Sequence, residues 1–374
     1  MSGVKLYIGL MSGTSADSID AALVDLTSSS PQLIATHSAD IRTLKPEIHA
    51  LASCGENEIH RMGQLDRELG LRFAQAANEL ITQQKLSAAD ITAIGSHGQT
   101  IRHFPPSTND EHAYSLQVGD SNTIAQLTGI TTVADFRRRD IALGGHGAPL
   151  VPAFHQAVFE KPGCPRAIVN IGGMANITLL PGDSSPSSLL GYDTGPGNAL
   201  MDSWINQNLG QPYDNNGHWA AQGQVIGSLL QQMLETPYLS QSAPKSTGPE
   251  LFNLSWLTKH LNQLPKASAV DVQATLLEFT AHTISEALRS HTPLAMEVFF
   301  CGGGTYNTAL IQRLEALLHP TLIASTEQLG IAPEWVEAVA FAWLAKQTLE
   351  GKPGNAPTVT GASKASILGA IYPA

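Results

Sequence analysis

The chain has 374 residues, of which 43% are hydrophobic and 14% charged, and its formal net charge is −11. This length suits two domains with a large buried core, and the negative charge argues against general binding to nucleic acid or anionic membranes. No apolar run approaches the roughly 18 residues of a membrane span, and the N-terminus lacks the apolar stretch of a signal peptide. Three cysteines without a CxxC pair predict reduced, buried thiols. We therefore expect a cytoplasmic protein.

The first part of the chain predicts strands that alternate with helices. Residues 6–26 predict a strand, a hairpin turn and a second strand, and residues 91–103 predict a short strand that runs into a loop of Gly, His and Gln. Residues 116–130 predict a strand and a helix that is capped by Asp120 or Ser121, and residues 131–136 another strand. Residues 60–84 predict a helix whose apolar stripe consists of Leu65, Leu69, Phe73, Ala76 and Leu80.

The pattern starts again at residue 167. Residues 167–180 predict two apolar strands around a glycine turn, and residues 296–318 predict a strand, a glycine turn and a helix. A helix over 271–290 has an apolar stripe of Leu277, Ala281, Ile284 and Leu288. The sequence therefore predicts an α/β fold with duplicated lobes around a central cleft. We place the lobes at residues 1–147 and 148–374, because residues 144–165 are rich in Pro and Gly.

Two glycine-bearing hairpins are candidate phosphate sites. Residues 12–20 concentrate Ser, Thr, Gly and Asp between two apolar strands, and residues 170–176 read NIGGMAN. Glycines let backbone N–H groups approach an anion, and hydroxyl groups add further donors. An ordinary polar turn explains the first hairpin equally well, but a second hairpin of the same layout favours two turns that hold a polyphosphate.

Two further stretches have a possible role in nucleotide binding. Gly302, Gly303 and Gly304 lie between a predicted strand and helix, where the backbone can pass close to a nucleotide, or simply turn tightly. The spacing is not that of a dinucleotide-binding fingerprint. Lys245 stands in KSTG without the upstream glycine of a P-loop, so it is either a phosphate contact or a surface lysine.

Asp193 is the strongest candidate for a catalytic group. It follows an apolar run and precedes the turn Thr194–Gly197 and a helix that starts near Asn198. A carboxylate at such a junction can deprotonate a nucleophile in phosphoryl transfer. The alternative is that Asp193 caps the local turn, and Asp202 is expected to be structural.

The remaining candidates are charged groups and histidines. Arg137, Arg138 and Arg139 are consecutive, so they cannot all face one site, and we expect one or two to be solvated and one to reach the cleft. Glu337, in a predicted helix that starts at Pro333, either points into the cleft or is solvated. The spacing of His97, His103, His146 and His155 matches no metal motif.

Together these motifs closely resemble the anhydro-N-acetylmuramic acid kinase family. The resemblance spans residue 8 to the C-terminus and lies in the segments GLMSGTSADSIDAALVD, GSHGQTIRH, QVGD, VADFRRRDIALGGHGAPLVP, NIGGMANIT, GYDTGPGNALMD, KSTG, CGGGTYNTALI and EAVAFAWLA. It implies the two-lobed fold of the sugar kinase, Hsp70 and actin superfamily. It also implies an enzyme that uses ATP with Mg²⁺ to open and phosphorylate 1,6-anhydro-N-acetylmuramic acid, giving N-acetylmuramic acid 6-phosphate and ADP in cell-wall recycling. A homodimer that binds small molecules, and neither nucleic acid nor membrane, is expected.

The resemblance also assigns residues. It implies Asp193 as general base, with Arg137 and Glu337 in the active site, and His97, Gln99, Asp120 and Arg137 as substrate contacts. Nucleotide contacts are expected from Ser12, Gly13, Thr14, Ser15, Ala16, Asp17, Ser18, Ile19, Asp20, Gly172, Gly173, Asn176, Gly302, Gly303 and Gly304.

The sequence departs from the family pattern at two positions. Ser18 replaces a glycine, which would strain a positive φ there, and Pro249 stands where an arginine is usual. Two other functions stay open at this stage. A nucleotide-switch protein would need the loops but no sugar-specific base, and a metallohydrolase would need metal ligands.

Overall fold

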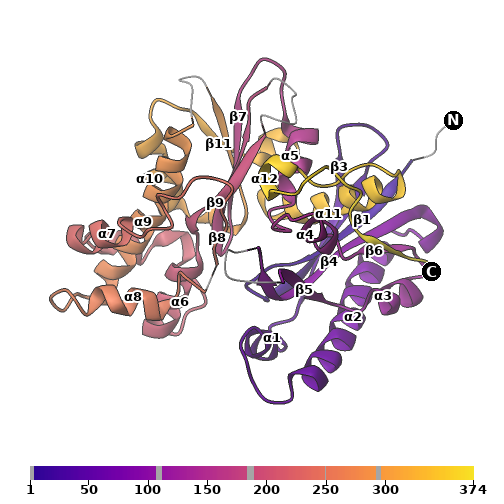
Figure 1. Cartoon of the computed structure of the whole chain (residues 1–374), viewed down its shortest axis with the longest axis horizontal. Coiled ribbons are helices and arrows are strands. Elements are labelled where there is room, and N and C mark those ends of the chain that lie inside the picture. The colour runs from indigo at the N-terminus through magenta and orange to yellow at the C-terminus, as the bar shows by residue number, and fades with distance from the viewer. Residues whose placement is uncertain (1–3, 107–111, 183–188, 249, 292–295) are drawn as a thin grey trace. The chain divides into compact units, whose positions relative to one another are not determined.

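We describe a computed structural model of the chain over residues 4–106, 112–182, 189–248, 250–291 and 296–374. The chain divides into two compact units, residues 1–158 with 335–374 and residues 159–334, which are coloured by residue number in Figure 1. Each unit has its own sheet and its own hydrophobic core. Among the described residues, no helix is long and apolar enough to cross a membrane.

Unit 1, as we call residues 1–158 with 335–374, contains one sheet in the order β12-β6-β4-β1-β2-β3, with β5 paired to β4. Its strands are β1 (Leu6–Ser12), β2 (Ser18–Asp25), β3 (Gln32–Asp40), β4 (Ile91–Phe104), β5 (Tyr114–Val118), β6 (Thr132–Ala134) and β12 (Ala370–Tyr372). Its helices are α1 (Lys45–Leu51), α2 (Glu58–Gln83), η1 (Ala88–Asp90), α3 (Ser121–Thr128), α4 (Arg138–Ala142), α5 (Val151–Phe159, which ends at the boundary), α11 (Val336–Leu349) and α12 (Pro357–Thr360).

Unit 2, residues 159–334, contains a sheet in the order β11-β10-β7-β8-β9. Its strands are β7 (Arg166–Ile171), β8 (Met174–Leu180), β9 (Leu190–Pro196), β10 (Glu297–Cys301) and β11 (Ile323–Ser325). Its helices are α6 (Ala199–Leu209), η2 (Asn215–Gly217), η3 (Ala220–Gln222), α7 (Gly227–Leu234), α8 (Leu254–Leu261), α9 (Ala269–Arg289), η4 (Gly303–Tyr306), α10 (Thr308–Leu318), η5 (Thr326–Leu329) and η6 (Pro333–Trp335, which crosses the boundary).

The two sheets repeat one topology. In unit 1, β1, β2 and β3 form an antiparallel meander, and β1 pairs in parallel with β4, which pairs in parallel with β6. In unit 2, β7, β8 and β9 form the same meander, and β7 pairs in parallel with β10, which pairs in parallel with β11. The predicted α/β fold with duplicated lobes is therefore confirmed, in agreement with the two-lobed superfamily that the resemblance implied.

The two faces of the unit 1 sheet pack against different helices. Successive side chains of a strand point to opposite faces, and Ile8 and Leu10 of β1 join the core cluster that contains the apolar stripe of α2. All five predicted stripe residues of α2 are buried. Gly9, between Ile8 and Leu10, faces α11 on the other side of the sheet.

Two glycines bring α11 unusually close to this sheet. Gly9 of β1 pairs directly with Gly95 of β4. A Cβ atom on Gly9 would lie 1.7 Å from the carbonyl oxygen of Ala338, and one on Gly95 would lie 2.0 Å from that of Phe341. Because both obstacles are helix backbone, no side-chain movement can relieve them. The glycine pair therefore sets the depth of α11, and with it the position of Glu337.

Three expectations differ from the structure. The stretch 91–103 is one continuous strand of 14 residues, β4, and not a strand followed by a loop, because β1 and β5 both pair with it. Residues 335–374 belong to unit 1, so the division into 1–147 and 148–374 differs from the observed units, although the boundary at 158 lies inside the predicted stretch 144–165. All three cysteines are free as expected, but only Cys301 is buried, since Cys54 is exposed and Cys164 is half-buried.

Replacing either buried glycine should destabilise unit 1. We expect Gly9→Ala and Gly95→Ala each to lower the free energy of unfolding by about 3 kcal/mol or more, because overpacking against rigid backbone leaves no room for relaxation. Thermal unfolding measures the change. Gly63→Ala in α2, where a Cβ meets open space, is the matched control and should stabilise by roughly 0.5–1 kcal/mol. Wild-type melting of both sheet variants would contradict the packing argument.

Candidate functional site

The hairpin between β1 and β2 is held by a buried hydrogen bond to β4. Ser12 Oγ donates to Gln99 Oε1 at 2.7 Å, and Gln99 Nε2 donates to the carbonyl oxygen of Gly13 at 3.3 Å. Thr14 and Ser15 at the tip are exposed, and a Cβ on Gly13 would meet open space. The turn therefore presents two hydroxyl groups and an unobstructed backbone to solvent, as phosphate binding requires.

The other residues predicted in this hairpin have several roles. Ala16 and Ile19 are buried in the core, and Asp17 forms an ion pair of 2.8 Å with Lys45 of α1. The positive φ of the hairpin falls on Ala16, at 51°, whereas Ser18 begins strand β2. Ser18 has no positive φ, so the condition under which it would be strained is not met.

Arg137 and His97 form the centre of a polar cluster at this end of the sheet. Arg137 Nη2 lies 2.8 Å and Nε 3.2 Å from His97 Nε2. His97 Nδ1 lies 2.8 Å from the carbonyl oxygen of Gly98, so this nitrogen is the protonated one and Nε2 accepts from the arginine. Burial, and then the positive charge of Arg137, lower the pKa of His97 to about 3. The imidazole is therefore neutral near pH 7.

Position 98 explains how β4 presents His97 and Gln99. Gly98 has a φ of +72°, and the pairing with β1 shifts register there, since Leu10 pairs with Ser96 but Ser12 pairs with Gln99. A bulge of this kind re-aims the side chains around it. Glycine, histidine and glutamine suggested a loop in the sequence, and the structure places them in a bulged strand.

Glu337 joins the same cluster from α11. Burial raises its pKa, the nearby Arg137 lowers it and Asp20 raises it, so Glu337 lies within electrostatic reach of both Arg137 and Asp20. Asp20 also accepts hydrogen bonds from Ser18 and Ser38, at 3.0 and 2.8 Å. Arg138 and Arg139 are exposed, which confirms that one arginine of the three faces inward.

Asp120 lies apart from these contacts. Its side chain accepts from the backbone N–H of Asn122 at 3.1 Å, as the N-cap of α3, and lies 3.6 Å from Arg67 of α2. The helix that the sequence predicted here, with Asp120 as its cap, is confirmed. A capping role accounts for Asp120, and its contact with substrate stays a prediction.

In unit 2, the predicted glycines converge on the end of β7. Gly172 and Gly173 form the β7–β8 turn, and their carbonyl groups accept the N–H groups of Asn198, Gly197 and Ala199 at 2.8–3.0 Å, where α6 begins. A Cβ on Gly302 would lie 2.3 Å from Asn170 Oδ1, and one on Gly304 would lie 2.3 Å from Ile171 Cγ2. A Cβ on Gly303 would meet open space. The two glycine turns thus adjoin one strand end.

Asp193 lies within β9, opposite Asn176 of β8, and not after the strand as expected. Its Oδ2 accepts the backbone N–H of Thr247 at 3.0 Å, and its carbonyl oxygen accepts from the hydroxyl group of Tyr238 at 2.7 Å. The segment 238–247 therefore wraps the aspartate from both sides. The helix that follows, α6, has Asn198 at its N-cap, so Asp193 does not cap it.

Lys245 secures this segment from within. Its Nζ donates to the carbonyl oxygens of Tyr238 and Leu239 at 3.3 and 3.0 Å and lies 4.9 Å from the centre of the Tyr238 ring. Burial lowers the pKa of Lys245, and the nearby carboxylate of Asp193 raises it. The interpretation of Lys245 as a plain surface lysine is therefore wrong. Its contact with phosphate stays a prediction. Pro249, where the family has arginine, lies outside the described residues.

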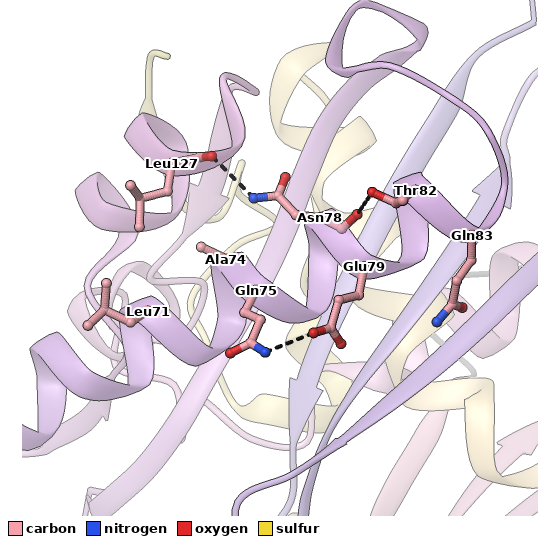
Figure 2. Close-up of a pocket in the computed structure, with 8 residues that line it drawn as sticks. All are labelled: Leu71, Ala74, Gln75, Asn78, Glu79, Thr82, Gln83 and Leu127. Carbon is pink, nitrogen blue, oxygen red and sulfur yellow. Dashed lines mark hydrogen bonds between the residues drawn. The ribbon is translucent and has the colours of Figure 1, made fainter.

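A surface hollow elsewhere on unit 1 contains none of the predicted site residues. It lies on α2 and α3, where Asn78 Nδ2 donates to the carbonyl oxygen of Leu127 at 3.2 Å (Figure 2). Its lining consists of Leu71, Ala74, Gln75, Asn78, Glu79, Thr82, Gln83 and Leu127. Its one carboxylate, Glu79, accepts from Gln75 Nε2 at 2.8 Å and lies 2.7 Å from His37 Nε2.

Comparisons with known proteins agree with the motifs. Residues 5–374 match the family described as anhydro-N-acetylmuramic acid kinase. The chain is 52% identical over 367 residues to the anhydro-N-acetylmuramic acid kinase of Coxiella burnetii (strain Dugway 5J108-111), with 98% of this chain and 97% of the relative covered. It is 51% identical over 370 residues to that of Shewanella sediminis (strain HAW-EB3), with 98% of both covered.

Two solved structures are more distantly similar. The activator of the 2-hydroxyisocaproyl-CoA dehydratase from Clostridium difficile, with bound ADPNP, is 13% identical with a TM-score of 0.45, covering 92% of this chain and 97% of its own. The ROK hexokinase from Thermus thermophilus is 11% identical with a TM-score of 0.37, covering 91% of this chain and 99% of its own.

Buried histidines should make unit 1 sensitive to acid. Burial is the main cause that lowers the pKa of His97 and His155 to about 3 and of His103 to about 4, from 6.5. Above pH 6.5 these groups are neutral in both the folded and unfolded chain. Below pH 6.5 the histidines of the unfolded chain bind protons while those of the folded chain stay neutral. Stability should therefore fall as the pH decreases from 6.5 to about 3, by on the order of 2 kcal/mol per histidine at pH 5.

Thermal unfolding at pH 7.5 and pH 5 measures this loss. His155→Gln should reduce the difference in melting temperature between the two pH values. His60→Gln, at an exposed position of α2, is the control and should leave the difference as in the wild type. Equal differences in all three proteins would refute a contribution from His155.

Proposed function

The chain belongs to the anhydro-N-acetylmuramic acid kinase family, and we propose that it opens the anhydro bond of 1,6-anhydro-N-acetylmuramic acid and phosphorylates O6 with ATP. The products are N-acetylmuramic acid 6-phosphate and ADP, and the role is the recycling of cell-wall fragments. The observation that carries the proposal is Asp193, a carboxylate on β9 that the segment around Thr247 holds by a backbone hydrogen bond of 3.0 Å. A carboxylate fixed in this way suits a general base.

The chemistry of the substrate requires such a base. The anhydro bond joins the anomeric carbon to O6, so O6 is not a free hydroxyl group. Water attacks the anomeric carbon, and Asp193 takes its proton. The bond from the anomeric carbon to O6 breaks with its electron pair on O6, which attacks the γ-phosphorus as the bond to the ADP oxygen breaks. Hydrolysis and phosphoryl transfer are then one coupled event with a single base.

We assign the phosphate and sugar contacts to the groups described above. The hydroxyl groups of Thr14 and Ser15 and the backbone at Gly13 donate hydrogen bonds to phosphate oxygens, because these groups are accessible at the hairpin tip. Gly172 and Gly173 are further phosphate contacts, and Gly302–Gly304 contact adenosine. His97 and Gln99 contact the sugar, with Arg137 and Glu337 completing the polar cluster of unit 1.

Magnesium is expected to arrive with ATP and not as a resident ion. The described residues hold no group of three or more His, Cys, Asp or Glu side chains placed to bind a metal. Mg²⁺ commonly binds through one or two carboxylates together with substrate phosphates, and Asp20 and Glu337 are carboxylates within electrostatic reach of each other. They fit such an ion, which neutralises phosphate charge.

Cytoplasmic location, expected from the N-terminus and the cysteines, and a homodimer, implied by the family resemblance, complete the proposal. Size-exclusion chromatography with light scattering tests the dimer. A mass near 79 kDa, about twice the 39.6 kDa of the chain, is expected, and a monomer at micromolar concentration would refute it.

The exposed hydroxyl group of Thr14 should matter for ATP. We expect Thr14→Val to raise the KM for ATP about tenfold, because one donor to phosphate is lost, while Thr14→Ser keeps the hydroxyl group and stays within about twofold of the wild type. Steady-state kinetics with varied ATP measures both. Equal KM values for the valine and serine variants would show that the hydroxyl group of this hairpin residue does not contact phosphate.

Asp193→Asn tests the base directly. The change should lower sugar-dependent ADP release by about 10²- to 10⁴-fold, because the amide cannot accept the proton, and should leave ATP binding by calorimetry nearly unchanged. Asp202→Asn in α6 is the matched control and should keep near-normal turnover. In ¹⁸O-labelled water, mass spectrometry should find the label at the anomeric oxygen. Label in the phosphate, or normal turnover of the Asp193 variant, would overturn the coupled mechanism.

A further inference from the structure

Asp140 is a fully buried carboxylate with three defined donors. Its exposed fraction is 0%. Oδ2 accepts the backbone N–H of Gly147 at 2.8 Å, and Oδ1 accepts from Asn355 Nδ2 at 2.7 Å and from Thr360 Oγ1 at 2.8 Å. Burying a carboxylate is costly unless hydrogen bonds compensate, and these three donors supply that compensation.

Gly147 connects this carboxylate to the polar cluster. Its N–H donates to Asp140, and its carbonyl oxygen accepts from Arg137 Nη1 at 2.8 Å. Gly147 has a φ of +70°, and a Cβ there would lie 2.8 Å from Ile141 Cγ1, so only glycine fits this conformation without strain. The N–H group of Gly147 thus contacts the buried carboxylate of Asp140, and its carbonyl group contacts the guanidinium of Arg137. This single residue links the two side chains.

Gly145 confirms how tightly the loop closes around the carboxylate. Its N–H donates to the carbonyl oxygen of Asp140 at 3.0 Å, and a Cβ on Gly145 would lie 2.3 Å from Asp140 Oδ2. The N–H of His146 donates to the carbonyl oxygen of Thr360 at 2.7 Å. The loop 143–147 is therefore fixed to the C-terminal segment at several points.

We propose that Asp140 is a positioning residue for Arg137, and that Asn355 and Thr360 act through it to orient the guanidinium toward His97. The consequence for catalysis rests on the function proposed above. The donors come from a segment more than 200 residues along the chain, with sequence separations of 215 and 220. The C-terminal segment of unit 1 thereby sets the geometry of an arginine in the candidate site, where an error of about 1 Å can lower a rate about 10²-fold.

A structural role alone would stabilise the loop without controlling Arg137, so the test must observe the arginine. The reporter is His97 Nε2, which accepts from the guanidinium. In protein with ¹⁵N-labelled histidine, its ¹⁵N resonance, assigned with His97→Gln, changes when that donor leaves. We expect the resonance in Asp140→Asn to move from the wild-type position toward its position in Arg137→Ala.

Two further variants complete the spectroscopic experiment. Asp214→Asn is the matched control, because Asp214 is a buried aspartate of unit 2 that accepts from the N–H groups of Trp219 and Ala220, both at 2.9 Å. It should leave the His97 resonance unchanged even if it lowers the melting temperature. Thr360→Val removes one donor, keeps the carboxylate, and should shift the resonance part of the way. It replaces Asp140→Asn if that protein does not fold.

A double-mutant cycle measures the effect on turnover. Asp140→Asn should lower kcat/KM about 10- to 100-fold in the wild-type background and less than twofold in the Arg137→Ala background, because a residue that acts through Arg137 has nothing to position once the arginine is gone. Asp214→Asn should give the same ratio in both backgrounds.

An unshifted His97 resonance in Asp140→Asn and Thr360→Val would overturn the proposal, and so would kcat/KM losses that multiply fully with that of Arg137→Ala. If the wild type releases no ADP with the anhydro-sugar, the proposed function fails. The His97 resonance still decides the positioning role in that case.

Discussion

The close approach of α11 to the sheet of unit 1 is the constraint on which the candidate site depends. Gly9 and Gly95 pair across β1 and β4 and let helix backbone lie where side chains would otherwise stand. The same approach places Phe341 beside His97, with ring centres 4.7 Å apart, and puts Glu337 within electrostatic reach of Arg137. The lack of side chains at Gly9 and Gly95 thus determines where His97, Arg137 and Glu337 meet.

This constraint also explains why the C-terminal segment belongs to unit 1. The helix α11 fills the glycine-lined face, and the chain that follows contributes Asn355 and Thr360 before β12 joins the sheet beside β6. The C-terminal segment therefore provides both the hydrogen-bond donors to Asp140 and the edge strand beside β6. Sequence reasoning assigned these residues to the second lobe, because local patterns carry no information about the sheet to which a late helix returns.

The elements with strong local signals were predictable from the sequence. The apolar stripes of α2 and α9, both hairpins and the capped helix α3 follow from periodicity and turn chemistry, and all are confirmed. The continuous strand β4 was not predictable, because Gly98 reads as a turn residue when its partners β1 and β5 are unknown. Of the candidate site, Arg137, His97, Gln99 and Ser12 do come together. The role of Asp140 was not predictable from the sequence, because two of its hydrogen-bond partners, Asn355 and Thr360, lie over 200 residues away.

The unit 1 cluster combines the positive charge of Arg137 with two acidic side chains, Asp20 and Glu337. His97 is neutral near pH 7, since burial and Arg137 lower its pKa to about 3, so it orients the guanidinium without adding or removing charge. Glu337 is the variable member: burial and Asp20 raise its pKa, while Arg137 lowers it. A phosphate group that arrives nearby raises that pKa further, because like charge disfavours the carboxylate. A nearby phosphate and the guanidinium of Arg137 therefore act on the pKa of Glu337 in opposite directions.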